Sequence, residues 1–283
     1  MTELKYLPEI DRRLILWRNT LQLFRKLNRP KFEGPFHKCN YNYQIEPFLR
    51  NNYEETDYNP DIVASNDNSW LIIELTNNSD KSKCDRILKY KDLEGRNLSI
   101  YGLKPHKTTP EILTSRIEYI DDKECCQIIV KDKFEVCKLN LLHYSALVDA
   151  LTTSRGDDLS KLPAIPITLV PESKKLEIRR GISDIVMMLF KPGSEGLTSR
   201  QIVELSLERI SEKTGEKQKK DLAKKIEIEM ELLIGRFLKG YIKLDSGKYI
   251  STTDSVKSVQ RREYIESKIE EWASSEQSNL SNF

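Results

Sequence analysis

Apolar residues recur at helical spacing at the start of the chain and form strand-like runs after residue 60. One face of residues 9–27 carries Ile10, Leu14, Trp17, Leu21 and Phe24. This spacing predicts an amphipathic helix that packs against a core. Residues 42–55 predict a second, short helix that carries Glu46 and Phe48.

The pattern then changes to that of a sheet. Two apolar runs, at residues 61–65 and 70–76, flank the polar segment Asn-Asp-Asn-Ser and predict a β-hairpin. The second run is apolar on both faces apart from Glu74, which is typical of a central strand. Further along, we expect a helix at 80–93, a strand at 97–103, a helix at 109–117 and strands at 126–132 and 133–139. This order predicts an α/β (α+β) fold, with a mixed sheet flanked by helices.

A change in composition marks a domain boundary. Pro163, Pro166 and Pro171 interrupt residues 154–175, which excludes a continuous helix there. We therefore assign residues 1–160 to a first domain, 161–178 to a linker and 179–283 to a smaller, mostly helical domain. The sequence of the second domain predicts a helix, a turn and a second helix capped by Thr198 or Ser199. A long helix, two short strands and a final helix are expected to follow.

Composition narrows the class of protein. The 283 residues include 46 basic and 44 acidic side chains, so the net charge of +2 does not identify an anionic partner. The five cysteines form no CxxC pair and the three histidines are scattered, which argues against a structural zinc site. Unpaired thiols without a signal sequence predict a cytoplasmic protein, and no apolar run is long enough for a membrane span. The chain has no Gly-rich phosphate loop, GxSxG or HExxH motif.

Two carboxylates in the predicted hairpin suggest chemistry. Asp61 follows Pro60 at the start of one strand, and Glu74 lies near the end of the next. In an antiparallel hairpin the two side chains can lie side by side, and carboxylate oxygens are the ligands that Mg²⁺ prefers. The structural alternatives are a turn aspartate and a solvated glutamate. However, a glutamate within an apolar run is costly unless it is exposed or liganded.

These residues carry a resemblance to a known family. Pro60-Asp61, followed after twelve residues by Glu74-Leu75-Thr76, resembles the PD-(D/E)XK superfamily of restriction-endonuclease-like nucleases, over roughly residues 44–102. The resemblance implies that Asp61 and Glu74 bind Mg²⁺, with Mn²⁺ as a substitute, and that Glu46 is an additional ligand. The motif lysine is replaced by Thr76. Either a lysine of the next helix supplies the cation, Lys83 in preference to Lys81 and Lys91, or the site has lost activity.

The second domain resembles the winged helix-turn-helix family over residues 180–253. This resemblance implies that the third helix contacts the DNA major groove with its N-terminal part and that the hairpin contacts the backbone. The alternatives are solvated lysine faces and a module for dimerisation or protein binding. The candidate DNA-binding residues are Lys217, Lys219, Lys220, Lys224, Lys225 and, in the hairpin, Lys248.

The two resemblances together predict a Mg²⁺-dependent endonuclease of the restriction or mobile-element type. We expect double-stranded DNA as its substrate, a homodimer or a protein partner, and no membrane association. One alternative is a non-catalytic DNA-binding regulator or assembly factor with a degenerate nuclease domain, which Thr76 favours. A third hypothesis is a nuclease that acts on RNA.

Overall fold

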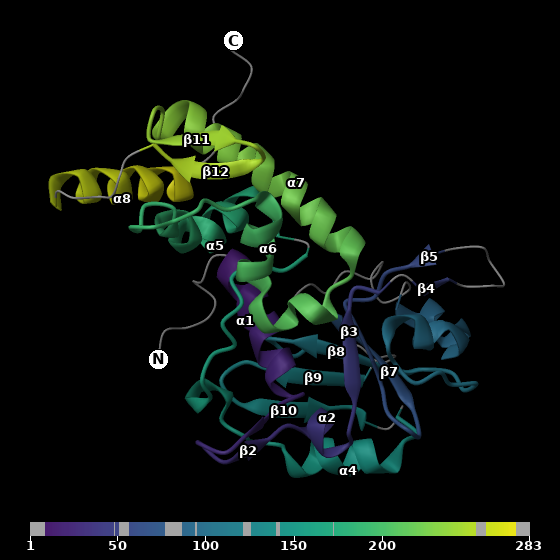
Figure 1. The fold of residues 1–283 in the computed structure, drawn as a ribbon. Helices are drawn as coiled ribbons and strands as arrows, with labels where there is room; N and C mark the ends of the chain where they lie inside the picture. Colours follow the sequence, from purple (N-terminus) through teal and green to yellow (C-terminus); the bar gives the residue numbers. More distant parts are fainter. Residues whose placement is uncertain are drawn as a thin grey trace. The chain divides into compact units, whose positions relative to one another are not determined.

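The structure is a computed structural model, and it divides into two compact units (Figure 1). It describes residues 9–47, 49–50, 57–76, 87–93, 95–120, 126–139, 142–171, 173–252 and 259–275. The first unit comprises Met1–Ile165 with Lys213–Gly215, and the second comprises Pro166–Glu212 with Glu216–Phe283. Helix α5 begins at Lys175, inside the segment expected to be a linker.

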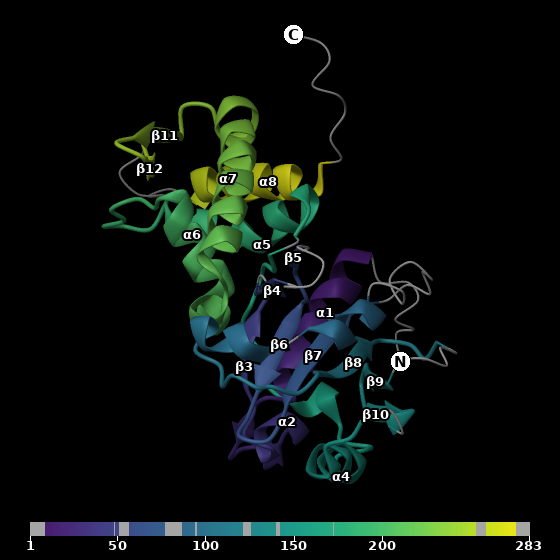
Figure 2. The ribbon, with the colours of Figure 1, turned by 90° about the vertical axis from the view of Figure 1, so that its right-hand side faces the viewer.

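A six-stranded mixed sheet forms the centre of the first unit, in the order β10-β9-β8-β7-β6-β3 (Figure 2). Strands β3, β6 and β7 are antiparallel neighbours, β7, β8 and β9 are parallel, and β10 is antiparallel to β9. The prediction of a mixed sheet flanked by helices is therefore confirmed. The strands are β3 (Asn42–Ile45), β6 (Ile62–Ser65), β7 (Trp70–Leu75), β8 (Glu111–Arg116), β9 (Cys126–Val130) and β10 (Phe134–Cys137).

Helix α1 (Glu9–Gln22) packs against β8 and β9. The hydroxyl oxygens of Thr20 and Ser115 are 2.6 Å apart, and the Asn19 side-chain amide donates to the Val130 carbonyl at 2.8 Å. These contacts fix the helix across the parallel strands. The smaller elements of this unit are β1 (Lys26–Leu27), β2 (Phe32–Glu33), α2 (Pro35–Lys38), β4 (Leu49–Arg50), β5 (Asp57–Tyr58), α4 (Ser145–Thr153) and η5 (Leu159–Lys161).

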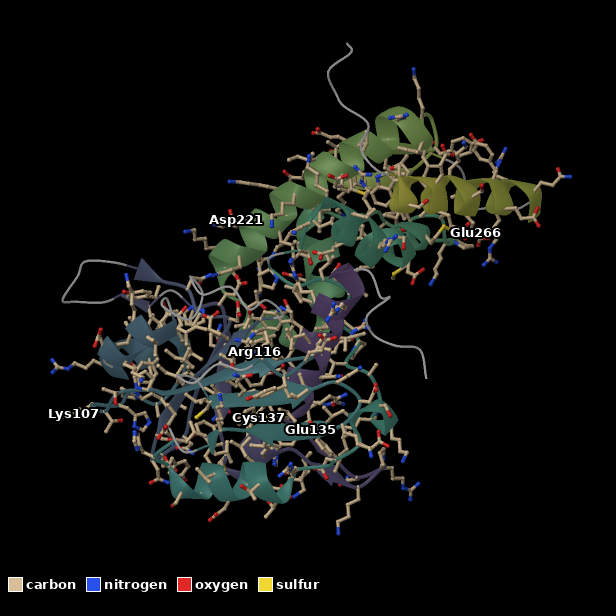
Figure 3. The ribbon with its side chains drawn as sticks, turned by 180° about the vertical axis from the view of Figure 1, so that it is seen from behind. Lys107, Arg116, Glu135, Cys137, Asp221 and Glu266 are labelled. Carbon is tan, nitrogen blue, oxygen red and sulfur yellow. The ribbon has the colours of Figure 1, made fainter. Side chains whose placement is uncertain are left out.

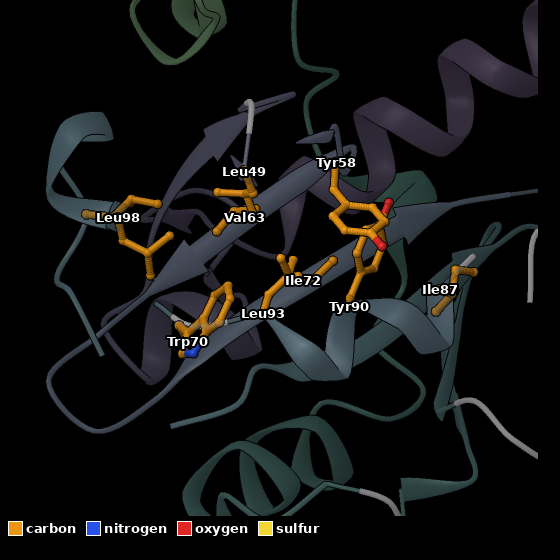
Figure 4. Close-up of a cluster of buried hydrophobic side chains, with 10 residues drawn as sticks. Leu49, Tyr58, Val63, Trp70, Ile72, Ile87, Tyr90, Leu93 and Leu98 are labelled. Carbon is orange, nitrogen blue, oxygen red and sulfur yellow. The ribbon is translucent and has the colours of Figure 1, made fainter. Parts of the chain in front are cut away.

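An apolar cluster lies between the sheet and two 3₁₀ helices, η2 (Lys89–Asp92) and η3 (Gly95–Tyr101) (Figure 4). Val63, Trp70 and Ile72 alternate along β6 and β7 and supply the sheet side of this cluster. Because side chains alternate across a strand, Glu74 belongs to the same face as these three residues, and Asp61 directly precedes β6. The cluster also contains Leu49, Tyr58, Ile87, Tyr90, Leu93, Leu98 and Leu103.

Three predicted elements of the first unit were wrong. Residues 42–45 form strand β3 rather than part of a helix, because they pair along their whole length with β6. Residues 111–116 form strand β8, where pairing with β7 and β9 outweighs the helix-start signal of Thr109-Pro110. Residues 97–101 belong to a 3₁₀ helix rather than a strand, and the first helix ends at Gln22.

The second unit consists mainly of helices. Thr198 caps α6: its hydroxyl accepts from the Gln201 N–H at 3.1 Å, and the Gln201 side chain accepts from the Thr198 N–H at 2.9 Å. Helix α5 packs against α6, α7 and α8. The elements are α5 (Lys175–Met188), α6 (Ser199–Leu207), η6 (Glu208–Lys213), α7 (Glu216–Leu232), the π-helical turn η7 (Leu233–Phe237), β11 (Ile242–Asp245), β12 (Lys248–Ser251) and α8 (Val259–Ser274).

The β11–β12 hairpin is joined to the segment that precedes α6. Leu197 and Tyr249 exchange two backbone hydrogen bonds, of 3.1 and 2.8 Å. The preceding Gly196 has a φ of +80°, and a Cβ there would lie 2.7 Å from the Tyr249 carbonyl oxygen. This close approach requires glycine. Among the described helices of both units, none is long and apolar enough to cross a membrane.

Candidate active site

Asp61 and Glu74 lie opposite each other at the open end of the β6–β7 hairpin. Ile62 pairs with Ile73 in this antiparallel register, so Asp61, one residue before, stands opposite Glu74, one residue after. Residues that stand opposite each other share a face of the sheet. The Leu75 N–H donates to Asp61 Oδ2 at 2.6 Å, which holds the Asp61 carboxylate at the end of β7. The backbone of the hairpin thus places Asp61 and Glu74 at the same end of two neighbouring inner strands.

The Glu74 carboxylate is enclosed. The residue is 1% exposed, and the Tyr90 hydroxyl donates to Glu74 Oε1 at 2.6 Å. Tyr90 belongs to the apolar cluster and is itself 1% exposed (Figure 4). A hydrogen bond from a buried tyrosine orients the carboxylate and offsets part of the cost of its burial. From the sequence, Tyr90 had no signal other than its helical spacing from Ile87.

Glu46 directly follows β3 and lies next to Asp61 across the β3–β6 pair. Its N–H donates to the Asp61 carbonyl at 2.9 Å, since Ile45 pairs with Ile62 in β3 and β6. Glu46 is buried, and it ends a strand with a φ of +43° instead of lying on the predicted helix. This departure from strand geometry means that the register does not set the direction of its side chain.

The candidate metal ligands are two carboxylates, those of Asp61 and Glu74, rather than a cluster of three or more side chains. In the part of the chain that the structure describes, no three side chains of Asp, Glu, His or Cys form a group that could hold a metal ion. The structure therefore does not gather Glu46 with Asp61 and Glu74 into a three-ligand site. Mg²⁺, however, is commonly held by one or two carboxylates together with waters and substrate phosphates. Asp61 and Glu74 fit that requirement.

The position of the motif lysine is buried. Thr76 is 2% exposed, and its N–H donates to the Ser115 carbonyl at 3.1 Å. The preferred substitute Lys83, and also Lys81, lie outside the described residues. Lys91 is exposed on η2.

The candidate DNA-binding lysines of the second unit differ in their surroundings. Lys217, Lys220 and Lys224 are exposed on α7, whereas Lys248 in β12 is half-buried. Lys219 is 8% exposed and forms an ion pair of 3.4 Å with Glu216, which lies at the start of the helix.

Lys225 is bound to the protein's own backbone. Its half-buried ammonium donates to the carbonyls of Pro171 and Ser173, at 3.4 and 3.3 Å. These contacts tie α7 to the segment before α5. A structural role therefore accounts for Lys225, and three lysines of α7 remain on its surface.

Charge is divided along α7. The exposed lysines are in its first half, where Arg200 of α6 also binds Glu216 at 2.9 Å. In the second half, burial raises the pKa of the Tyr249 hydroxyl to about 12, and the nearby carboxylates of Glu227 and Glu231 add to this shift. The acidic half of α7 thus faces the hairpin, and the basic half is at its N-terminal end.

Comparison with known proteins gives no relative: no protein-family model, curated protein or solved structure matches this chain. What the protein does must therefore be inferred from the chemistry of its own residues. The carboxylate pair of the first unit and the lysines of α7 are the two features that suggest a function.

Proposed function

We propose that this protein is a metal-dependent endonuclease that hydrolyses phosphodiester bonds of double-stranded DNA. The observation that carries the proposal is the antiparallel register of β6 and β7: continued one residue beyond the Ile62–Ile73 pair, it sets Asp61 opposite Glu74. A mixed sheet with flanking helices is the architecture that the nuclease resemblance implies.

Asp61 and Glu74 would hold Mg²⁺ or Mn²⁺ through their carboxylate oxygens. A bound divalent ion supplies Lewis acidity toward the phosphate and lowers the pKa of a bound water. The Leu75 N–H and the Tyr90 hydroxyl each fix one carboxylate oxygen, as outer partners of metal ligands do. In hydrolysis the water oxygen attacks phosphorus and one P–O ester bond breaks. One water proton goes to the leaving oxygen and the other to solvent.

The second unit supports DNA binding. Helices α5, α6 and α7, followed by a two-stranded hairpin, have the order expected of a winged helix-turn-helix. The first half of α7 presents Lys217, Lys220 and Lys224 to solvent, and exposed lysines bind phosphates without regard to sequence. We infer that this half of α7 contacts the DNA and that the first unit cuts it.

The carboxylate Asp61 tests the proposal directly. A pool of plasmids of varied sequence should be nicked or linearised by the wild-type protein in Mg²⁺ or Mn²⁺ and left intact in EDTA. Asp61→Asn should cut at least about 100-fold more slowly, because a lost ligand forfeits several kcal/mol of charge stabilisation. The matched control is Asp67→Asn, at an exposed residue of the same hairpin's turn that binds Lys104. Equal inertness of the wild type and Asp61→Asn would overturn the proposal.

The lysines of α7 give a second prediction. The double variant Lys220→Ala/Lys224→Ala should bind a 30-base-pair duplex more weakly, and the slope of log affinity against log salt should fall by about 1.8. The control is Arg262→Ala/Lys268→Ala on α8, where both cations are paired, with Glu266 and Glu271. Fluorescence anisotropy across a salt series measures both. Equal slopes for the two double variants would contradict DNA binding by α7.

Thr76 favours a second candidate function, a DNA-binding regulator with a degenerate nuclease unit. The position that the resemblance assigns to a lysine holds a buried, uncharged residue. Tight DNA binding with a steep salt slope, and no cleavage in any divalent ion, would support this alternative over the nuclease.

A further inference from the structure

A buried arginine, Arg116, lies one diagonal backbone step from Glu74 in the sheet. Arg116 is the last residue of β8, the strand parallel to β7, and it is 1% exposed (Figure 3). Glu74 pairs with Thr114, so Arg116 is two residues further along the neighbouring strand and on the same face of the sheet. That step is about 6.6 Å along the strand and about 4.8 Å across, or roughly 8 Å in all. A long side chain can cover this distance.

Arg116 also lies beside the position of the missing lysine. Leu75 pairs with Ser115 in the parallel register, and the Thr76 N–H donates to the Ser115 carbonyl at 3.1 Å. Thr76 and Arg116 therefore follow this pair on adjacent strands. The chain has an uncharged residue where the resemblance implies a cation, and a cation at the neighbouring position of the next strand.

The charged residues on this face of the sheet are consistent with a cation on β8 in place of the lysine on β7. In β3 and β6 to β10, as far as the structure describes them, Arg116 is the one cationic strand residue on the face of Asp61 and Glu74. Buried charges are costly unless opposite charges compensate them. Glu74 and Arg116 are equally enclosed on this face, each 1% exposed.

We propose that Arg116 binds the scissile phosphate and supplies the positive charge that a lysine at position 76 would otherwise provide. This inference rests on the proposed nuclease function. A guanidinium presents two parallel N–H donors, which match two phosphate oxygens. It stays protonated throughout the accessible pH range and cannot accept a proton. Arg116 therefore stabilises charge and positions the phosphate, and the proton of the attacking water goes to solvent.

Moving the cation between the two strands tests the inference. We compare the wild type, Arg116→Met, and the double variant Arg116→Met/Thr76→Lys, in which the cation is relocated to β7. Single-turnover cleavage of the plasmid pool should fall about 100-fold or more in Arg116→Met, as for the loss of one charge-stabilising donor. The double variant should recover at least a tenth of the wild-type rate. The control for loss of one charge is Arg155→Met, an exposed residue after α4.

DNA binding in EDTA gives a readout that does not depend on cleavage. The salt slope for the 30-base-pair duplex should fall by about 0.9 in Arg116→Met and return in the double variant. Circular dichroism establishes which variants fold.

The outcomes separate this inference from the function on which it rests. A wild type that cuts no substrate overturns both. If the wild type cuts and a folded Arg116→Met cuts within about threefold of its rate, only the role of Arg116 is overturned. If Arg116→Met does not fold, the double variant decides: recovery supports the role, and a folded but inert double variant overturns it.

Discussion

Replacing Glu74 with glutamine should reduce Mg²⁺-dependent DNA cleavage by about 1000-fold or more, because a neutral amide cannot replace a charged ligand whose interaction is worth several kcal/mol. The first unit should remain folded. Glutamine has the shape of glutamate, and its amide oxygen can still accept the 2.6 Å hydrogen bond from Tyr90. Single-turnover cleavage measures the loss, and calorimetric titration with Mn²⁺ should show weaker metal binding.

The sheet supplies a matched control for this change. Glu111 in β8 is also buried, but its carboxylate accepts the backbone N–H groups of His143 and Tyr144, just before α4. Glu111→Gln should therefore lower stability and leave the cleavage rate per folded molecule unchanged. Tyr90→Phe should give an intermediate loss, of about 10- to 100-fold, as for a residue that orients a ligand. Cleavage by Glu74→Gln within tenfold of the wild type would contradict a ligand role.

The part of the candidate site that lies in the hairpin could be predicted from the sequence. Its signals are local: two runs of strand-forming residues and a polar turn between them. In the structure, the Asn66 side chain accepts the N–H groups of Asn68 and Ser69, each at 2.8 Å, which closes the turn. Once the turn length is fixed, the register follows, and with it the position of Asp61 opposite Glu74.

Residues from outside the hairpin could not be placed in this way. Glu46 was expected on a short helix over residues 42–55, yet pairing with β6 makes residues 42–45 a strand that ends just before Glu46. Tyr90 binds Glu74 from a 3₁₀ helix, and Arg116 lies on the next parallel strand, two residues beyond the partner of Glu74. Such contacts depend on the order of strands in the sheet, which local periodicity does not encode.

The helices of the second unit were simpler to predict, because α6 has a clear N-cap and α5 and α7 have apolar faces. Thr198 with Gln201 forms the capping box that begins α6. The apolar faces of α5 and α7 supply Ile182, Val186, Ile226 and Met230 to the core, all of them buried. The buried ion pair of this unit had no such signal. Its two members are fifty residues apart, and charged residues are normally expected at the surface.

Removing one member of this ion pair should have a large effect on the stability of the second unit. Arg179 Nε lies 2.5 Å from Glu229 Oε2, and both side chains are 2% exposed. Arg179 Nη1 also donates to the Ser275 carbonyl, at 2.7 Å, so the guanidinium connects α5, α7 and the end of α8. Replacing Glu229 with leucine leaves this charge buried without its carboxylate. We expect the free energy of unfolding of the second unit to fall by about 3–5 kcal/mol.

The double variant Arg179→Met/Glu229→Leu should be more stable than Glu229→Leu alone, because it removes both charges and their desolvation together. Hydrogen exchange of the amides in α5 and α7, measured in increasing urea, reports on this unit separately from the first. A loss below about 1 kcal/mol in Glu229→Leu, the range of exposed pairs, would contradict the prediction. Since α7 carries the exposed lysines, Glu229→Leu should also lose DNA binding on warming before the wild type does, whereas cleavage-site variants such as Glu74→Gln should retain it.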